Sequence, residues 1–295
     1  MVIVRLMGGL GNQMFQYAMG RALAHARQAP VKVDFELLKA DAKRTYALDG
    51  WNVSAPVATP FEVLRIRAAN KLSWKLKPSA PFYVRPVLRE QTFLFDPDAL
   101  RAPQRCLLIG YWQSEKYFKN IETTIRQEFT LRIAPGDKTQ EVARAIQSCN
   151  SVCVHVRRGD FISEPHTQQA HGTCSLEYYR QAAEYIAQRI PDLRFFVFSD
   201  DAQWVRENLA LGVPITVIDH NPPGDGHAPG REHEDMWLMS LCKHAVLANS
   251  SFSWWAAWLN PSRGKRIVAP RAWPRHGSSG FMDTRDLIPL TWETV

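Results

Sequence analysis

Short apolar runs alternate with longer amphipathic segments from residue 151 onward. The runs are continuously apolar and rich in β-branched or aromatic residues, which is typical of strands buried on both faces of a parallel sheet. The segments between them repeat their apolar residues at helical spacing. The predicted strands span residues 152–156, 195–198, 215–218, 245–248 and 267–269, and the predicted helices span 176–190, 202–209, 233–244 and 252–259. This alternation predicts a doubly wound α/β domain.

The first part of the chain opens with the same alternation. Its predicted strands span residues 2–6, 31–34 and 106–110, and its predicted helices span 12–27 and 115–129. Residues 40–105 are rich in proline and show no regular pattern. We expect this region to shape the specificity for the acceptor.

A change of pattern separates the two parts. Pro135 and Gly136 interrupt the alternation, which places the boundary within residues 134–150. We therefore expect two domains, 1–140 and 141–295. The predicted fold is α/β, with two Rossmann-like lobes that contain parallel sheets and face each other across a cleft.

The composition is that of a globular protein. The 295 residues are 45% hydrophobic, which is ample for one or two cores. We expect neither a membrane span nor a signal peptide, because no apolar stretch is long enough and Arg5 interrupts the apolar run at the amino terminus. The expected location is the cytoplasm. The five cysteines lack the paired spacing of zinc sites and are expected to be reduced, structural thiols.

The net charge of +7 is distributed unevenly. Residues 1–150 contain 22 Lys and Arg against 13 Asp and Glu, whereas residues 151–295 contain 14 against 16. Within residues 61–77, basic residues alternate with apolar ones as in an amphipathic helix. We interpret this segment as a solvated helix packed by its apolar stripe, or alternatively as a peripheral contact with an anionic inner membrane or a lipid-linked acceptor. No nucleic-acid-binding motif accompanies the charge, so nucleic acid is not an expected partner.

The heptad HVRRGDF at residues 155–161 carries the strongest chemical signal. It starts within a predicted strand and continues as a charged turn, and open α/β sheets bind ligands at the carboxyl ends of their strands. Guanidinium groups bind phosphate oxygens in pairs, so Arg157 and Arg158 beside a glycine predict a diphosphate clamp. The alternative is a surface salt bridge between Arg158 and Asp160.

A glycine-rich turn joins the first predicted strand to its helix. Its sequence, GGLGNQ at residues 8–13, lets backbone N–H groups approach a ligand closely. Met14 stands where the dinucleotide fingerprint has its third glycine, and no GxxxxGK[ST] loop occurs, so nicotinamide and P-loop chemistry lose support. A tight structural turn would explain the glycines but would not require Asn12 and Gln13 at the start of the helix.

Hydroxyl and carboxyl side chains follow two further predicted strands. Residues 199–201, SDD, precede one predicted helix, and Ser250 and Ser251 precede another. Each set is either a helix cap or a nucleotide contact, since helix-terminal N–H groups also bind phosphate. The tryptophans within residues 254–258 are expected to lie in the core rather than to form a platform for a sugar.

Five ordered blocks resemble the bacterial and animal α-1,2-fucosyltransferases of glycosyltransferase family 11, and the resemblance spans nearly the whole chain. The blocks are MGGLGNQMFQYAMGRALA at 7–24, GYWQSEKYF at 110–118, HVRRGDF at 155–161, FSDDAQW at 198–204 and EDMWLMSLCKHAVLANSSFSWWAAWL at 234–259. The arginine block is shared more loosely with α-1,6-fucosyltransferases and protein O-fucosyltransferases. The glycine-rich and tryptophan-rich blocks therefore indicate the α-1,2 branch.

The resemblance implies a metal-independent, inverting GT-B enzyme without a cofactor. Such an enzyme transfers L-fucose from GDP-β-L-fucose to the 2-hydroxyl of a terminal β-galactoside, in O-antigen, lipopolysaccharide or another surface glycan. No metal-bridging DxD occurs where one belongs, because Asp200 and Asp201 are adjacent and residues 96–98 lie in an irregular segment. Residues 141–295 would bind the donor, and residues 1–140 would provide the acceptor side.

The expected catalytic residues are Arg158, Asp160, His155 and Asn12. The expected donor-binding residues are Gly9, Gly11, Asn12, Gln13, Arg157, Arg158, Ser199, Asp200, Asp201, Ser250, Ser251 and Phe252, with no metal ligand. Side chains alternate along an extended segment, so Arg157 and Arg158 are expected to diverge, and the resemblance favours Arg158 as the clamp. Asp160, His155 and Asp200 are the candidate bases. Asn12 and Gln13 are expected to reach the fucose or the acceptor from the opposite lobe.

Three other functions remain open from the sequence. The first is another GDP-fucose-dependent transferase with an α-1,6-linked or protein-linked product, which acceptor profiling would separate. The second is a non-catalytic carbohydrate-binding protein, which would bind glycans without affinity for GDP. The third is a peripheral membrane or nucleic-acid binder, whose binding would depend strongly on salt and not on guanine nucleotide.

Overall fold

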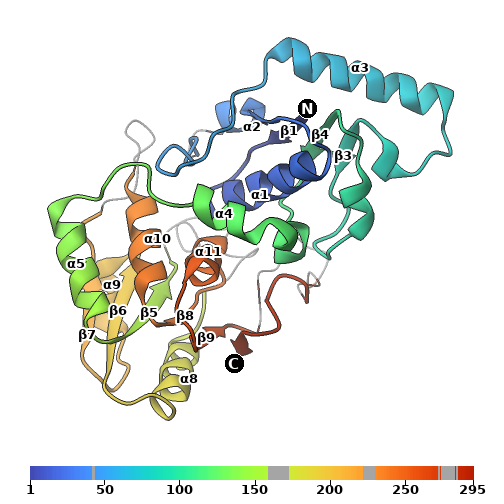
Figure 1. Cartoon of the computed structure of the whole chain (residues 1–295). Coiled ribbons are helices and arrows are strands. Elements are labelled where there is room, and N and C mark those ends of the chain that lie inside the picture. Colours follow the sequence, from blue (N-terminus) through green and yellow to red (C-terminus); the bar gives the residue numbers. More distant parts are fainter. Residues whose placement is uncertain (42–43, 159–172, 222–229, 272, 274–282, 284) are drawn as a thin grey trace. The chain divides into compact units, whose positions relative to one another are not determined.

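The computed structural model describes residues 1–41, 44–158, 173–221, 230–271, 273, 283 and 285–295 (Figure 1). The chain divides into two compact units. Unit 1 comprises Met1–Arg132 and Asp283–Leu287, and unit 2 comprises Ile133–Met282 and Ile288–Val295. Helix α5 (Asp137–Gln147) therefore belongs to unit 2, and a short segment that is distant in sequence completes unit 1.

A parallel sheet with the order β2-β1-β4-β3 forms the centre of unit 1. Its strands are β1 (Val2–Arg5), β2 (Val31–Asp34), β3 (Val87–Arg89) and β4 (Cys106–Ile109). β1 and β4 are buried along their whole length, which explains their continuous apolar sequence. Helix α1 (Leu10–Ala26) follows β1 and buries most of its residues. The predicted βαβ opening of the chain is confirmed.

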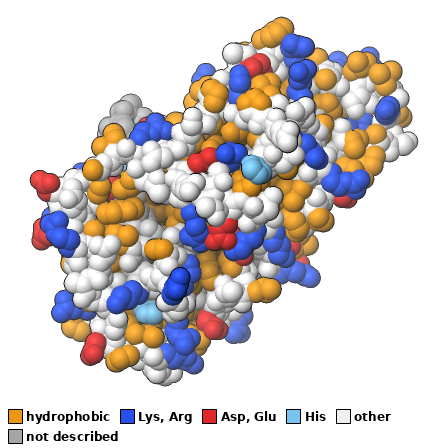
Figure 2. All heavy atoms as spheres, viewed as in Figure 1, with side chains coloured by type: hydrophobic (Ala, Val, Ile, Leu, Met, Phe, Trp, Pro, Cys, Tyr) orange, Lys and Arg blue, Asp and Glu red, His pale blue; other side chains and the backbone are white. Residues whose placement is uncertain are grey.

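The proline-rich region contains a long helix, α3 (Pro60–Leu76). The helix begins at a capping box, in which the Thr59 hydroxyl accepts from the Glu62 N–H and the Glu62 carboxylate accepts from the Thr59 N–H. Hydrophobic and basic side chains lie side by side over the surface that α3 forms (Figure 2). The other elements of residues 35–105 are α2 (Glu36–Lys39), η1 (Phe82–Val84), β3 and η2 (Pro97–Arg101).

The predicted helix over residues 115–129 is wrong in its first part. Two 3₁₀ turns, η3 (Glu115–Tyr117) and η4 (Lys119–Ile121), precede a shorter helix, α4 (Glu122–Glu128). Tyr117 and Phe118 are neighbours in sequence and both are fully buried. Because successive residues of an α-helix point about 100° apart, the irregular backbone at Phe118 buries both rings better than one helical face would.

Unit 2 is built on a parallel sheet with the order β10-β9-β8-β5-β6-β7. The strands are β5 (Asn150–Val156), β6 (Leu193–Ser199), β7 (Ile215–Ile218), β8 (His244–Val246), β9 (Ile267–Ala269) and β10 (Glu293–Thr294). The helices besides α5 are α8 (Leu176–Ala187), α9 (Ala202–Asn208), α10 (Glu232–Leu241) and α11 (Ser251–Leu259). The predicted doubly wound domain is confirmed, and its predicted strands and helices are present with ends that differ by a few residues. The helix predicted to reach His244 ends at Leu241, because His244 begins β8.

The tryptophans of α11 belong to the core of unit 2. Trp254 and Trp255 are fully buried and Trp258 is nearly so. Trp254 stacks on Trp258 with ring centroids 6.3 Å apart, and Trp292 packs against it from the end of the chain. The prediction that these rings fill the core is confirmed.

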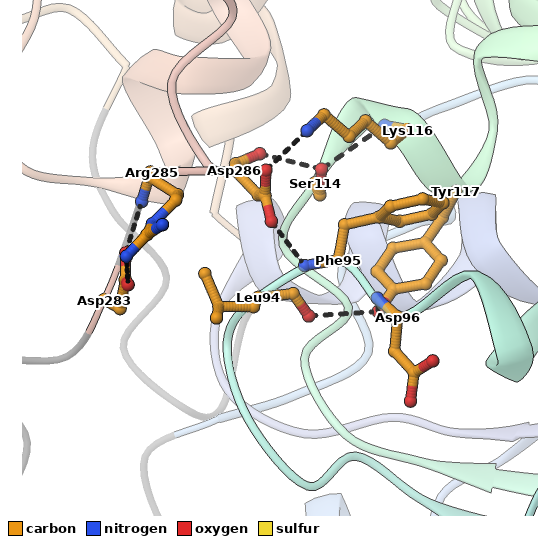
Figure 3. A network of polar contacts seen from close by, with 9 residues as sticks. All are labelled: Leu94, Phe95, Asp96, Ser114, Lys116, Tyr117, Asp283, Arg285 and Asp286. Atoms are coloured by element: carbon orange, nitrogen blue, oxygen red, sulfur yellow. Dashed lines mark hydrogen bonds and ion pairs between the residues drawn. The ribbon is translucent and has the colours of Figure 1, made fainter.

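The segment Asp283–Leu287 is fixed to unit 1 by a polar network (Figure 3). The Asp286 carboxylate accepts hydrogen bonds from the Phe95 N–H, at 2.9 Å, and from the Lys116 ammonium group. The Ser114 hydroxyl donates to the Asp286 carbonyl at 2.7 Å. Ser114 and Lys116 lie in the block GYWQSEKYF, so part of this block holds the segment in place.

None of the helices in the described ranges is long and apolar enough to cross a membrane. The five cysteines are unbridged, and Cys106, Cys153 and Cys242 are buried. Burial of these three agrees with the predicted structural role.

Candidate functional site

Polar side chains from three neighbouring strand ends meet at the carboxyl edge of the unit 2 sheet. β5 is paired with β6 on one side and with β8 on the other, and all three are parallel. Arg157 and Arg158 follow β5, residues 199–201 follow β6, and Ser250 precedes α11 after β8. The strand order reverses beside β5, and at such a point the loops separate and leave room for a ligand. The structure therefore groups most of the residues predicted to bind the donor.

Asp200 orders both arginines. One of its carboxylate oxygens lies 3.1 Å from Nη1 of Arg157, and the other accepts a hydrogen bond of 2.8 Å from the backbone N–H of Arg158. The carboxylate thus holds the turn after β5 against the end of β6. The predicted salt bridge to Asp160 and any catalytic role of Asp160 lie outside the described residues.

The side chain of Arg158 is held by stacking. Its guanidinium carbon lies 3.5 Å from the centre of the Trp204 ring. Its Nε is buried and finds no hydrogen-bond partner among the described residues, because the nearest Asp201 oxygen is 3.6 Å away. A guanidinium whose flat face is covered still presents its N–H groups in the plane, where they bind phosphate oxygens. Both arginines contact the segment after β6, since Arg157 pairs with Asp200 and Arg158 lies against Trp204, so their divergence stays a prediction.

Helix capping accounts for the neighbouring hydroxyl and carboxyl groups. Asp201 accepts from the Trp204 N–H at 3.0 Å and caps α9, while the Ser199 hydroxyl accepts from the Asp201 N–H at 3.0 Å. Ser250 caps α11 by accepting from the Phe252 N–H at 3.3 Å. The capping alternative is thus observed at both helices. The start of α11 lies at the same edge of the sheet, and the N–H groups of a first helical turn can bind an anion.

His155 is buried within β5 and is only 5% exposed. Its ring lies 5.5 Å from that of Phe252, so it packs the start of α11 against the strand. Burial, together with the charge of Arg157, lowers the pKa of His155 to about 3. A neutral imidazole of such low basicity is a poor proton acceptor near neutral pH. Burial and low basicity favour a packing and positioning role for His155, and its expected catalytic role stays a prediction.

The glycine-rich turn of unit 1 has a stereochemical requirement for glycine. Gly8 has a φ of +73°, and a Cβ there would lie 2.5 Å from Nδ2 of Asn12. Gly9 is the N-cap of α1, and no side chain caps the helix there. Gly11 lies buried in the first turn, and Asn12 accepts a hydrogen bond of 2.8 Å from the Gln113 amide.

Gln13 is fully buried and is engaged with the chain itself. Its amide donates to the carbonyls of Gly8, at 2.9 Å, and Thr45, at 2.8 Å, and accepts from the Ala47 N–H at 3.0 Å. The expected contact between this side chain and the donor is therefore replaced by a structural role. Gln16, which the sequence did not single out, bonds to both the N–H and the carbonyl of Met7.

Glu90 is a second residue that sequence reasoning missed. It follows β3, and its carboxylate oxygens accept from the N–H groups of Tyr111, at 2.6 Å, and Trp112, at 2.9 Å. Burial raises the pKa of Glu90 to about 7. These bonds hold Trp112 at a positive φ of 56°, and so place the following residue, Gln113, against Asn12. A lone acidic residue in a proline-rich region gave no pattern from which to infer this.

The carboxyl of Asp235, on α10, makes the free energy of unfolding depend on pH. Its carboxylate accepts from the Asn221 amide at 2.7 Å, and burial raises its pKa from 3.8 to about 7. The folded protein thus holds this proton more tightly than the unfolded chain, so the group weakens the fold as the pH rises from about 4 to 7. We expect Asp235→Asn to raise the free energy of unfolding at pH 8 by up to about 4 kcal/mol relative to the original protein.

Urea titrations at pH 5 and pH 8 measure this effect. The stabilisation by Asp235→Asn should be clearly smaller at pH 5, where the original carboxyl is largely protonated. Asp219→Asn, at a half-exposed ion pair with Arg206, is the matched control and should not reproduce the trend. Equal effects of Asp235→Asn at the two pH values would contradict the assignment.

Comparisons with known proteins agree with this architecture. The model of Glycosyl transferase family 11 matches residues 93–291. The chain is 33% identical to Alpha-1,2-colitosyltransferase of Escherichia coli over 288 residues, which cover 92% of each protein. It is 30% identical to the O-antigen biosynthesis glycosyltransferase WbnK of Escherichia coli over 291 residues, which cover 91% of this chain and 93% of the relative.

A solved structure shares the fold. The structure of Arabidopsis thaliana FUT1 in complex with GDP superposes with a TM-score of 0.50 and 14% identity, covering 90% of this chain and 69% of the other. The predicted GT-B class, with a parallel α/β sheet in each of two units, is thereby confirmed. The model of the family covers both the arginine and the tryptophan-rich blocks, and the chain is similar to its relatives over nearly its full length. The protein therefore belongs to glycosyltransferase family 11.

Proposed function

We propose that this glycosyltransferase transfers L-fucose from GDP-β-L-fucose to the 2-hydroxyl of a terminal β-galactoside, forming an α-1,2 linkage. The observation that carries the proposal is the arginine pair at the strand switch point of unit 2, ordered by Asp200 and Trp204. The similarity to an α-1,2-colitosyltransferase supports the linkage, and the similarity to WbnK supports a role in O-antigen synthesis.

The donor diphosphate is bound by local charge. Residues 151–295 contain 14 Lys and Arg against 16 Asp and Glu, so no general positive field attracts an anion there. Arg157, Arg158 and the N–H groups at the start of α11 provide the positive potential instead. These groups bind the diphosphate oxygens without a bridging metal ion.

The reaction proceeds by in-line attack with inversion. The acceptor oxygen forms a bond to C1 of the fucose while the bond from C1 to the diphosphate oxygen breaks, and GDP leaves with the electron pair. Arg157 and Arg158 stabilise the negative charge that develops on the leaving group. The hydroxyl proton passes to a carboxylate, for which Asp160 and Asp200 are the candidates, as the new bond forms, because His155 is too weakly basic to accept it.

A second donor is favoured by one observation, the 33% identity to a colitosyltransferase. Colitose is fucose without its 3-hydroxyl group. A site that binds this hydroxyl through hydrogen bonds rejects the deoxy sugar by about 10⁴-fold, whereas a site that lacks those bonds accepts both sugars. Competition between GDP-fucose and GDP-colitose therefore decides between the two donors.

The deciding experiment incubates the protein with each donor and a panel of β-galactosides in the presence of EDTA. NMR of the product shows the sugar, the anomeric configuration and the linked hydroxyl. An α-1,2-fucoside supports the whole proposal, and an α-1,2-colitoside alone changes the donor. GDP binding without transfer to a β-galactoside would refute the acceptor, and the loss of all transfer on adding EDTA would refute metal independence.

Asn12 is the proposed contact from unit 1 to the reacting sugar or the acceptor. We expect Asn12→Ala to lower kcat/KM by about 10- to 100-fold, since a misplaced reactant costs this much even without loss of a catalytic group. Asn52→Ala, at an exposed asparagine of unit 1 that bonds to Thr130, is the control. Turnover and donor affinity both equal to those of the control would remove Asn12 from the site.

A further inference from the structure

Helix α3 packs on unit 1 through one narrow face. Val63 and Ile66 are its buried residues, and they join Ile3, Leu107 and Ile109 in a small cluster beside the sheet. Asn70 and Ser73 continue this face, and the Asn70 side chain accepts from the Val87 N–H at 3.2 Å. One side of the helix is therefore fully committed to the fold.

The opposite face of α3 carries a second apolar stripe. Phe61, Leu64, Leu72 and Leu76 are 66%, 62%, 55% and 71% exposed. With Ala68 between them they recur every three or four residues, so they lie along one side of the helix. Single exposed leucines are ordinary, but a continuous stripe marks a surface that contacts something apolar. Our first interpretation of this segment, a helix packed by its apolar stripe, therefore accounts for only the inner face.

Basic side chains flank this outer stripe. Arg65, Lys71 and Lys75 share its side of the helix, and Lys77 follows at the C-cap. Glu62 is the sole acidic residue within α3 and is bound by Lys32 at 2.6 Å. Among the described residues no carboxylate forms an ion pair with Lys71, Lys75 or Lys77, whereas Arg67 on the flank pairs with Glu36. Figure 2 shows the resulting mixture of basic and hydrophobic side chains.

The helix is held rigidly at both ends. The capping box stabilises its first turn. The buried Arg85 stabilises its last turn by donating to the carbonyls of Ser73, Lys77, Pro78 and Ala80. The Arg85 guanidinium also lies 3.9 Å from the centre of the Trp74 ring. The outer face is thus presented on a fixed element, so little order has to be gained when it binds.

We propose that the outer face of α3 docks this enzyme on the surface of an anionic lipid bilayer. Phe61 and the leucines would enter the boundary between headgroups and acyl chains, while the lysines meet the lipid phosphates. A second copy of the chain fits this face less well, because pairing two such faces would bring lysines of the same charge together. The proposal does not rest on the identity of the donor or the acceptor.

Vesicle sedimentation of the 295-residue chain tests the proposal. We expect binding to vesicles of phosphatidylcholine with phosphatidylglycerol, weaker binding to phosphatidylcholine alone, and release by salt. Leu72→Ser with Leu76→Ser should lower the partition coefficient at least about tenfold. Lys71→Gln with Lys75→Gln should lower it about fivefold per lysine, and only on the anionic vesicles.

Matched controls come from unit 2. Ile133 is 79% exposed and Leu290 is 97% exposed, so Ile133→Ser with Leu290→Ser removes at least as much exposed apolar surface elsewhere and should leave binding unchanged. Equal binding to both kinds of vesicle, or equal loss in the controls, would overturn the proposal. A dimer in analytical ultracentrifugation that disappears with Leu72→Ser and Leu76→Ser would also overturn the proposal. It would show that a second copy of the chain binds this face. Transfer to a water-soluble acceptor should be the same in every variant, which separates this test from that of the proposed function.

Discussion

Replacing Arg158 by alanine is expected to lower kcat/KM for GDP-fucose by about 100- to 1000-fold. The guanidinium is stacked on Trp204, and Asp200 binds the backbone N–H of the same residue before any ligand arrives, so its interaction with the leaving diphosphate needs little reorganisation. Loss of a preorganised donor of this kind removes stabilisation that is strongest in the transition state. Initial-rate kinetics with a saturating acceptor measure the effect.

Two further variants make this test specific. Arg206→Ala removes an arginine of the same unit that is half exposed and paired with Asp219, and it should change kcat/KM by less than about threefold. Arg157→Ala shows how the clamp is shared, because Arg157 also forms the ion pair with Asp200. If Arg158→Ala retained the activity of the Arg206→Ala control while Arg157→Ala lost it, the clamp would be Arg157 and our preference would be wrong.

Replacing Arg85 by methionine is expected to lower the free energy of unfolding by about 3–5 kcal/mol. The side chain is 1% exposed and satisfies carbonyls of four residues at the end of α3 and in the loop after it. Methionine keeps the apolar stem but leaves these carbonyls without their donor. Urea unfolding followed by circular dichroism measures the loss.

The control for Arg85 is another arginine of unit 1. Arg101 is 63% exposed in its side chain and forms a local pair with Asp98, so Arg101→Met should cost less than about 1 kcal/mol. A similar, small cost for both variants would show that the carbonyls around Arg85 are readily hydrated. It would also remove the argument that α3 is a rigid element.

The sheet of unit 2 could be predicted from the sequence because strands that are buried on both faces are mostly apolar. β5 and β6 are each mostly apolar, and the polar residues that follow them mark the strand ends. Once a parallel sheet is inferred, those ends must meet at one edge. The proximity of Arg157, Arg158 and Asp200 could be predicted from the topology alone, but the ion pair and the hydrogen bond between them could not.

The sequence was less informative where the structure depends on side-chain hydrogen bonds between distant segments. Gln13 bonds to a loop more than thirty residues away, and Glu90 bonds to the turn after β4. Neither bond has a periodicity that sequence reveals. β3 is three residues long, too short to show any alternation. We therefore interpreted Gln13, beside the glycine-rich turn, as a ligand contact, whereas its hydrogen bonds stabilise the fold of unit 1.

The return of Asp283–Leu287 to unit 1 has a consequence for biosynthesis. As the chain leaves the ribosome, residues 1–132 emerge first, but the partners of Ser114 and Lys116 follow only after the strands β5 to β9 have been made. Unit 1 therefore cannot complete its native contacts during translation of its own residues. A nascent chain stalled before residue 283 should expose the Ser114–Lys116 segment to proteases, and synthesis of the last residues should protect it.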